Sequence, residues 1–72
     1  MKRGKVFRSL SGKFLRLMWD SPVDRDVIFI TAVDANQGHK SVCVALDVSQ
    51  VDQLCEELAA WSHVKKVEKA MR

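Results

Sequence analysis

The sequence has few of the residues that cross-link or interrupt small folds: two cysteines, three glycines and one proline among 72 residues. Two cysteines are too few for the disulfide framework of a small secreted domain. The longest nearly continuous apolar run, Val27 to Val33, has seven residues, whereas a membrane-spanning helix needs about 20. The basic start is not followed by an apolar stretch with a small-residue cleavage site, so no signal peptide is indicated. We therefore expect a cytoplasmic protein without a membrane span.

Complete catalytic motifs are also missing. No glycine-rich loop could cradle a phosphate. Asp34, Asn36 and Gly38 are spaced like the start of a calcium loop, but the downstream bidentate glutamate is missing. No nucleophile stands with both a base and an orienting group. We expect a protein that is not an enzyme and that uses no cofactor and no metal.

Two cysteines and two histidines are the residues that could bind zinc. Three residues separate His39 from Cys43, and seven separate Cys55 from His63, unlike the tight ligand pairs of structural zinc modules. Each cysteine stands in an apolar-patterned segment. We therefore expect two buried thiols that pack as small hydrophobic side chains.

Positive charge gathers at the N-terminus. The first 16 residues contain six basic residues and no acid, while the other 56 contain nine acids and six bases. A basic arm on a mildly acidic body is typical of proteins that bind nucleic acid, a membrane surface or an acidic partner, although a solvated terminus has the same composition. With the basic residues near the C-terminus, the candidates for binding nucleic acid or an acidic partner are Lys2, Arg3, Lys5, Arg8, Lys13, Arg16, Lys65, Lys66 and Lys69.

The length allows one domain, which we divide into a basic N-terminal arm, residues 1–12, and a single α+β domain, residues 13–72. Residues 5–18 could form a basic amphipathic helix that lies on a membrane. Gly12 disfavours that helix by about 1 kcal/mol. We prefer a strand over residues 13–19, followed by a loop around Pro22.

An antiparallel hairpin is the clearest element. Residues 27–33 are mostly β-branched or aromatic and apolar on both faces, which is typical of a central strand covered on each side. Residues 34–39 are polar and contain Asn36 and Gly38, which favour a turn. Residues 41–48 then alternate between apolar and small or polar side chains, as a second strand does.

A helix follows the hairpin. Ser49 is a suitable N-cap, and Asp52 stands where a capping box needs an acceptor. Residues 51–61 carry one apolar stripe that should lie on the sheet. Propensity lets the helix continue to Met71, but weak helix formers around His63 also allow a short strand over residues 64–68. The stripe consists of Val51, Leu54, Cys55, Leu58 and Trp61.

The stretch from Lys13 to Ala70 resembles an ACT-type regulatory domain, a ferredoxin-like β-α-β-β-α-β module, with the best match over residues 26–70. Residues 26–33 and 40–48 resemble the family's second and third strands, and residues 50–58 its second helix. The first helix of the family is missing here, since three residues separate Pro22 from the next strand.

The resemblance has two implications. The segment from Ala60 to Val67 looks like the family's helix end, turn and closing strand. The loop after the first strand looks like the start of its effector site, where an amino acid would bind, although Val23 replaces the usual glycine. The effector-binding residues implied are Asp20, Ser21, Pro22 and Val23.

We thus predict an α+β fold, with a small antiparallel sheet of three to five strands and one main amphipathic helix on one face. One helix leaves the second face without cover, so the N-terminal segment, a second copy or another protein must supply it. The favoured function is a small non-enzymatic interaction or regulatory module that dimerises, or binds a larger protein, through its sheet. The alternative is nucleic-acid binding by the basic arm and the C-terminal lysines.

Overall fold

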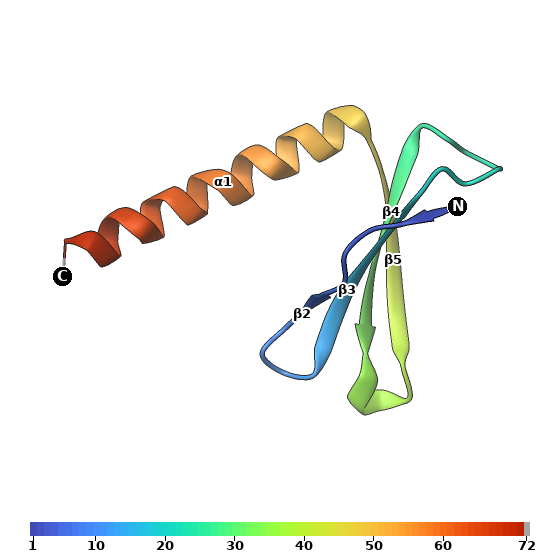
Figure 1. Ribbon diagram of the computed structural model, residues 1–72, viewed down its shortest axis with the longest axis horizontal. Coiled ribbons are helices and arrows are strands. Elements are labelled where there is room, and N and C mark those ends of the chain that lie inside the picture. Colours follow the sequence, from blue (N-terminus) through green and yellow to red (C-terminus); the bar gives the residue numbers. More distant parts are fainter. Residues whose placement is uncertain (72) are drawn as a thin grey trace.

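The computed structural model describes residues 1–71 and contains one antiparallel sheet followed by one long helix (Figure 1). The predicted α+β class is confirmed, with five strands in the sheet. No helix among residues 1–71 is long and apolar enough to cross a membrane. The elements in chain order are β1 (Lys2–Arg3), β2 (Phe7–Arg8), β3 (Lys13–Trp19), β4 (Val27–Asp34), the 3-10 turn η1 (Ala35–Gln37), β5 (Lys40–Asp47) and α1 (Val48–Ala70).

The sheet has the order β1-β3-β4-β5, and β2 pairs with β3 beside β1. The strand predicted for residues 13–19 is confirmed, and it pairs antiparallel with β4 from Lys13↔Asp34 to Met18↔Phe29. The alternative helix over residues 5–18 is therefore wrong. β4 is central, as its apolar composition predicted, because it lies between β3 and β5.

The predicted hairpin is confirmed. β4 and β5 pair over eight positions, from Val27↔Asp47 to Asp34↔Lys40. The connection turns through Gly38 and His39, whose φ angles of 66° and 59° lie in the left-handed region. The side chain of Asp34 accepts a hydrogen bond from the Asn36 amide at 3.0 Å, which caps η1.

The basic arm adds strands to the sheet instead of covering a face. β1 pairs with the end of β3 (Arg3↔Met18), and β2 pairs with its start (Arg8↔Phe14). The Gly4 amide donates a hydrogen bond to the Leu17 carbonyl at 2.9 Å, which continues the pairing. Both short strands thus extend the edge next to β3.

α1 is one continuous helix to Ala70, so the closing strand that the family resemblance implied for residues 64–68 is wrong. The predicted cap is also wrong by two residues. Asp47, not Ser49, is the N-cap: its carboxylate accepts from the Gln50 amide at 2.8 Å, and the Gln50 side-chain oxygen accepts from the Asp47 amide at 3.0 Å. No residue intervenes between β5 and α1, so this capping box fixes the direction in which the helix leaves the sheet.

The molecule is extended. Its radius of gyration is 15.0 Å and its extents are 48 × 32 × 16 Å, whereas a compact domain of this length has a radius of gyration of about 11 Å. Figure 1 shows why: α1 starts at the end of β5 and runs away from the sheet. Within residues 1–71, Val33 is the only hydrophobic residue that is buried.

Candidate functional site

The pairing register sorts the side chains of the sheet onto two faces, because paired residues share a face and successive residues alternate. We call one the apolar face and the other the arginine face. The apolar face is formed by Phe7, Leu15, Leu17, Trp19, Ile28, Ile30, Ala32, Val42, Val44 and Leu46. The arginine face is formed by Arg3, Arg8, Phe14, Arg16, Met18, Phe29, Thr31, Val33, Ser41, Cys43 and Ala45.

The apolar face is open to solvent over much of its area. Leu15 is 43% exposed, Val44 is 49% exposed and Val42 is 70% exposed. The register places Lys13 and Asp34 on the same side of the sheet. They lie at the margin of the apolar face, where their side chains pair at 4.0 Å. Hollows of about 310, 490 and 400 Å³ lie along the sheet, and Ile28, Val42 and Leu15 of this face each line one of them. The sheet therefore presents a hollowed apolar surface with charges at its rim.

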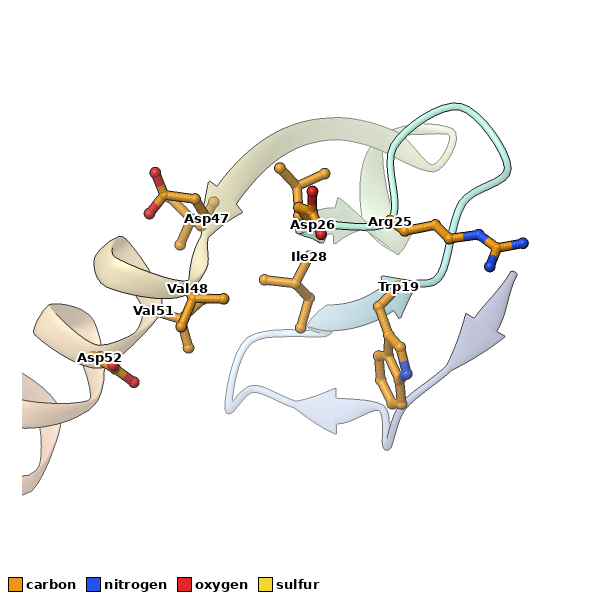
Figure 2. Close-up of a pocket in the computed structure, with 10 residues that line it drawn as sticks. Trp19, Arg25, Asp26, Ile28, Asp47, Val48, Val51 and Asp52 are labelled. Atoms are coloured by element: carbon orange, nitrogen blue, oxygen red, sulfur yellow. The ribbon is translucent and has the colours of Figure 1, made fainter.

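α1 meets the sheet only near its N-terminal end. Figure 2 shows the hollow at this junction, with Trp19 and Ile28 from the sheet and Val48 and Val51 from the first turns of the helix. Arg25, from the loop before β4, points away from the helix. Beyond these turns the helix leaves the apolar face uncovered.

The predicted apolar stripe of α1 is consequently exposed, with Leu58 at 58% and Trp61 at 65% exposure. At 100° per residue, the stripe spans about 120° of the helix surface. The apolar residues nearer the C-terminus do not continue it. They are centred about 145° around the axis from the first stripe, where the second stripe consists of Ala60, Val64, Val67 and Met71.

The structure separates the predicted basic residues into three groups. Arg3, Arg8 and Arg16 share the arginine face. Lys2 and Lys13 belong to the other side of the sheet, where Lys2 pairs with Asp20 at 3.4 Å. The third group lies outside the faces: Lys5 is in the loop between β1 and β2, 5.8 Å from the centroid of the Phe7 ring, and Lys65, Lys66 and Lys69 are near the end of α1.

The loop suggested as an effector site has its own internal bonds. Asp20 adopts a left-handed φ of 57°, and the buried Ser21 hydroxyl accepts from the Val23 amide at 3.3 Å. Val23 itself is 95% exposed. The hollow at the α1 junction is lined by Trp19, Arg25 and Asp26, on either side of the loop, but not by residues 20–23.

The expectation of buried thiols is wrong, since both Cys43 and Cys55 are exposed. Cys43 lies on the arginine face at the edge strand, and Cys55 lies on the uncovered stripe of α1. Among residues 1–71 no three histidine, cysteine, aspartate or glutamate side chains stand close enough to bind a metal ion.

Sequence reasoning did not find the grouping of the three arginines. Alternation along β3 places Arg16 between Phe14 and Met18 on one face. The faces of Arg3 and Arg8, however, depend on how two-residue strands pair with β3, and strands that short have no detectable periodicity.

Comparison with known proteins does not identify the site: no family model, no curated protein and no solved structure matches the chain.

Proposed function

We propose that the protein is a non-enzymatic interaction module that acts as a homodimer, in which α1 of each copy packs on the apolar face of the other. One observation carries this proposal: a single chain has two apolar surfaces, the apolar face and the helix stripe, and both are largely exposed in the described residues. Large exposed apolar patches on a small chain are typical of interaction sites.

The helix does not fold back over its own sheet (Figure 1). Connections that reverse a chain from a strand to a helix usually contain about two to six residues, but here Val48 follows Asp47 directly. The capping box between Asp47 and Gln50 holds the first turn in place. Within one chain, the helix stripe is thus held away from the apolar face of the sheet.

The dimensions fit a reciprocal arrangement. With 23 residues, α1 is about 35 Å long. The eight-residue strands β4 and β5 are about 27 Å long. One helix can therefore span the apolar face of a second copy. In a dimer with two-fold symmetry, the helix stripe of each copy would pack on the apolar face of the other copy, so that both faces and both stripes would be buried.

The exposed area agrees with an interface of this extent. A compact monomer of 8.2 kDa exposes about 4,500 Å², whereas this chain exposes 6189 Å². The excess of about 1,700 Å² per chain corresponds to about 3,400 Å² for two chains, which is in the range of obligate dimers. A second copy is the favoured occupant because the chain already contains both complementary surfaces.

Light scattering coupled to size exclusion tests the proposal. The wild-type chain should have twice the chain mass of 8.2 kDa. Leu58→Asp on the stripe and Val44→Asp on the apolar face should each abolish the dimer, because each would bury an unpaired carboxylate. The matched control is Val23→Asp on the exposed loop, which should remain dimeric.

Mixing the two disruptive variants tests the reciprocal arrangement. The Leu58→Asp chain keeps an intact apolar face, and the Val44→Asp chain keeps an intact stripe. The mixed dimer therefore has one intact contact, and dimer should partly return. A wild-type chain that is monomeric and unfolds cooperatively would refute the proposal. So would a chain that folds only after another protein is added, because that result would make the occupant a different partner.

A further inference from the structure

The arginine face collects three guanidinium groups from three separate strands. Arg3 lies on β1 opposite Met18, and Arg8 lies on β2 opposite Phe14. Arg16 lies on β3 between those two partners. Since strands rise about 3.3 Å per residue, the four steps from Phe14 to Met18 extend this basic row over about 13 Å.

The charge of this row is not neutralised within the part of the chain that the structure describes. The ion pairs among the described residues involve Lys2, Lys13 and Lys65 and none of the three arginines. The three arginines are exposed. On β1, β2 and β3 the arginine face contains no acidic residue, and Asp47, at the far end of β5, is occupied in the helix cap.

Aromatic side chains accompany the arginines. The Arg8 guanidinium lies 6.0 Å from the centroid of the Phe14 ring, in cation–π geometry. Phe29 on β4 pairs with Met18 on the same face. Guanidinium groups bind phosphates, and flat aromatic rings stack on nucleobases. Both kinds of group occur on one face of the sheet.

We propose that the arginine face binds single-stranded nucleic acid, with Arg3, Arg8 and Arg16 on successive phosphates and Phe14 stacked on a base. A single strand fits better than a duplex because stacking needs unpaired bases. A duplex is typically read by an element that enters a groove, and the arginine row lies flat along strands. This site is on the side of the sheet opposite the apolar face, so binding does not require the proposed dimer and is not blocked by it.

Fluorescence anisotropy with a labelled 20-nucleotide oligothymidylate tests the site. The wild-type chain should bind at low salt, and the same oligonucleotide as a blunt duplex should bind more weakly. The triple variant Arg3→Gln, Arg8→Gln and Arg16→Gln should lose about tenfold or more in affinity, and its log–log salt slope should decrease by about 2, since each phosphate contact on a single strand contributes about 0.7. Phe14→Leu should weaken binding without changing that slope.

The matched control removes the same charge elsewhere: Lys65→Gln, Lys66→Gln and Lys69→Gln on α1 should leave the affinity within about twofold. Light scattering and circular dichroism on every variant separate loss of binding from loss of the dimer or the fold. An equal loss in both triple variants would show that net charge alone drives binding and would refute the site. Wild-type protein that leaves the anisotropy of the oligonucleotide unchanged at low salt would also refute it, and so would tighter binding of the duplex.

Discussion

At the scale of single residues, Gly4 shows how the arm is joined to the sheet. A Cβ atom at Gly4 would lie 2.7 Å from the Cζ3 atom of the Trp19 ring and 3.2 Å from the Cβ atom of Leu17. The missing side chain therefore lets the indole lie across the backbone of the arm while the Gly4 amide bonds to Leu17. Trp19 in turn lines the hollow where α1 begins.

We predict that Gly4→Ala displaces the Trp19 ring and lowers the free energy of unfolding by about 1–3 kcal/mol, the usual cost of overpacking. Urea unfolding followed by tryptophan fluorescence in a Trp61→Phe background measures both effects. Lys5→Ala, next in the chain and exposed, is the control and should lower the urea midpoint much less than Gly4→Ala, because it removes only an exposed contact with the Phe7 ring. An unshifted emission spectrum in Gly4→Ala would contradict this role of glycine.

The two cysteines report on the dimer. Cys55 lies on the stripe that the second copy would cover, whereas Cys43 lies on the arginine face, which stays open. We predict that iodoacetamide modifies Cys43 at least about tenfold faster than Cys55 in the native protein, because thiol reactivity follows access. Peptide mass spectrometry over time gives the two rates. Equal rates in the native protein would argue against a covered stripe, and urea should make the rates similar.

At the scale of elements, the junction of β5 and α1 determines the shape of the chain. The sequence was informative for the strands: residues 13–19 and 27–33 form strands as their composition predicted, and the polar segment with Gly38 forms the turn. It was less informative for the helix start, since Asp47, Ser49 and Asp52 are all plausible caps. Only the end of β5, fixed by its pairing with β4, makes Asp47 the cap.

We predict that Asp47→Ala destabilises the protein by about 1 kcal/mol, because the Gln50 amide loses its acceptor. Gln50→Ala should have a smaller effect of the same sign. Urea unfolding monitored by circular dichroism at one protein concentration measures both. Asp52→Ala is the control, because it removes a carboxylate nearby in α1 that makes no capping bond in the described structure. Equal effects of Asp47→Ala and Asp52→Ala would mean that only helix-dipole charge matters.

At the scale of the whole molecule, residues 1–71 form only a minimal hydrophobic core. One buried hydrophobic residue and a radius of gyration of 15.0 Å leave little apolar burial to offset the conformational entropy of 72 residues. Domains of this size usually need an additional source of stability. For this chain we infer that association supplies it.

We therefore predict that thermal stability depends on protein concentration. If folding is coupled to dimer formation, mass action makes Tm rise as the protein is concentrated. Scanning calorimetry over a hundredfold concentration range measures this rise. The Leu58→Asp variant is the comparison and should show no cooperative thermal transition at any of these concentrations, because it cannot form the dimer that folding requires. A wild-type Tm that is independent of concentration would contradict coupled folding and dimerisation.

The sequence by itself determined the three longer strands, β3, β4 and β5, the hairpin turn and the shortage of cover for an apolar sheet, because these follow from local periodicity and from counting apolar faces. The tertiary structure decided where the helix goes, since its direction depends on a junction without a loop, and which face each arm residue occupies, since short strands take their register from β3. The grouping of Arg3, Arg8 and Arg16 on one face is the product of that pairing. Residues that are far apart in sequence can form one binding surface only when the pairing of their strands places them on the same face of the sheet.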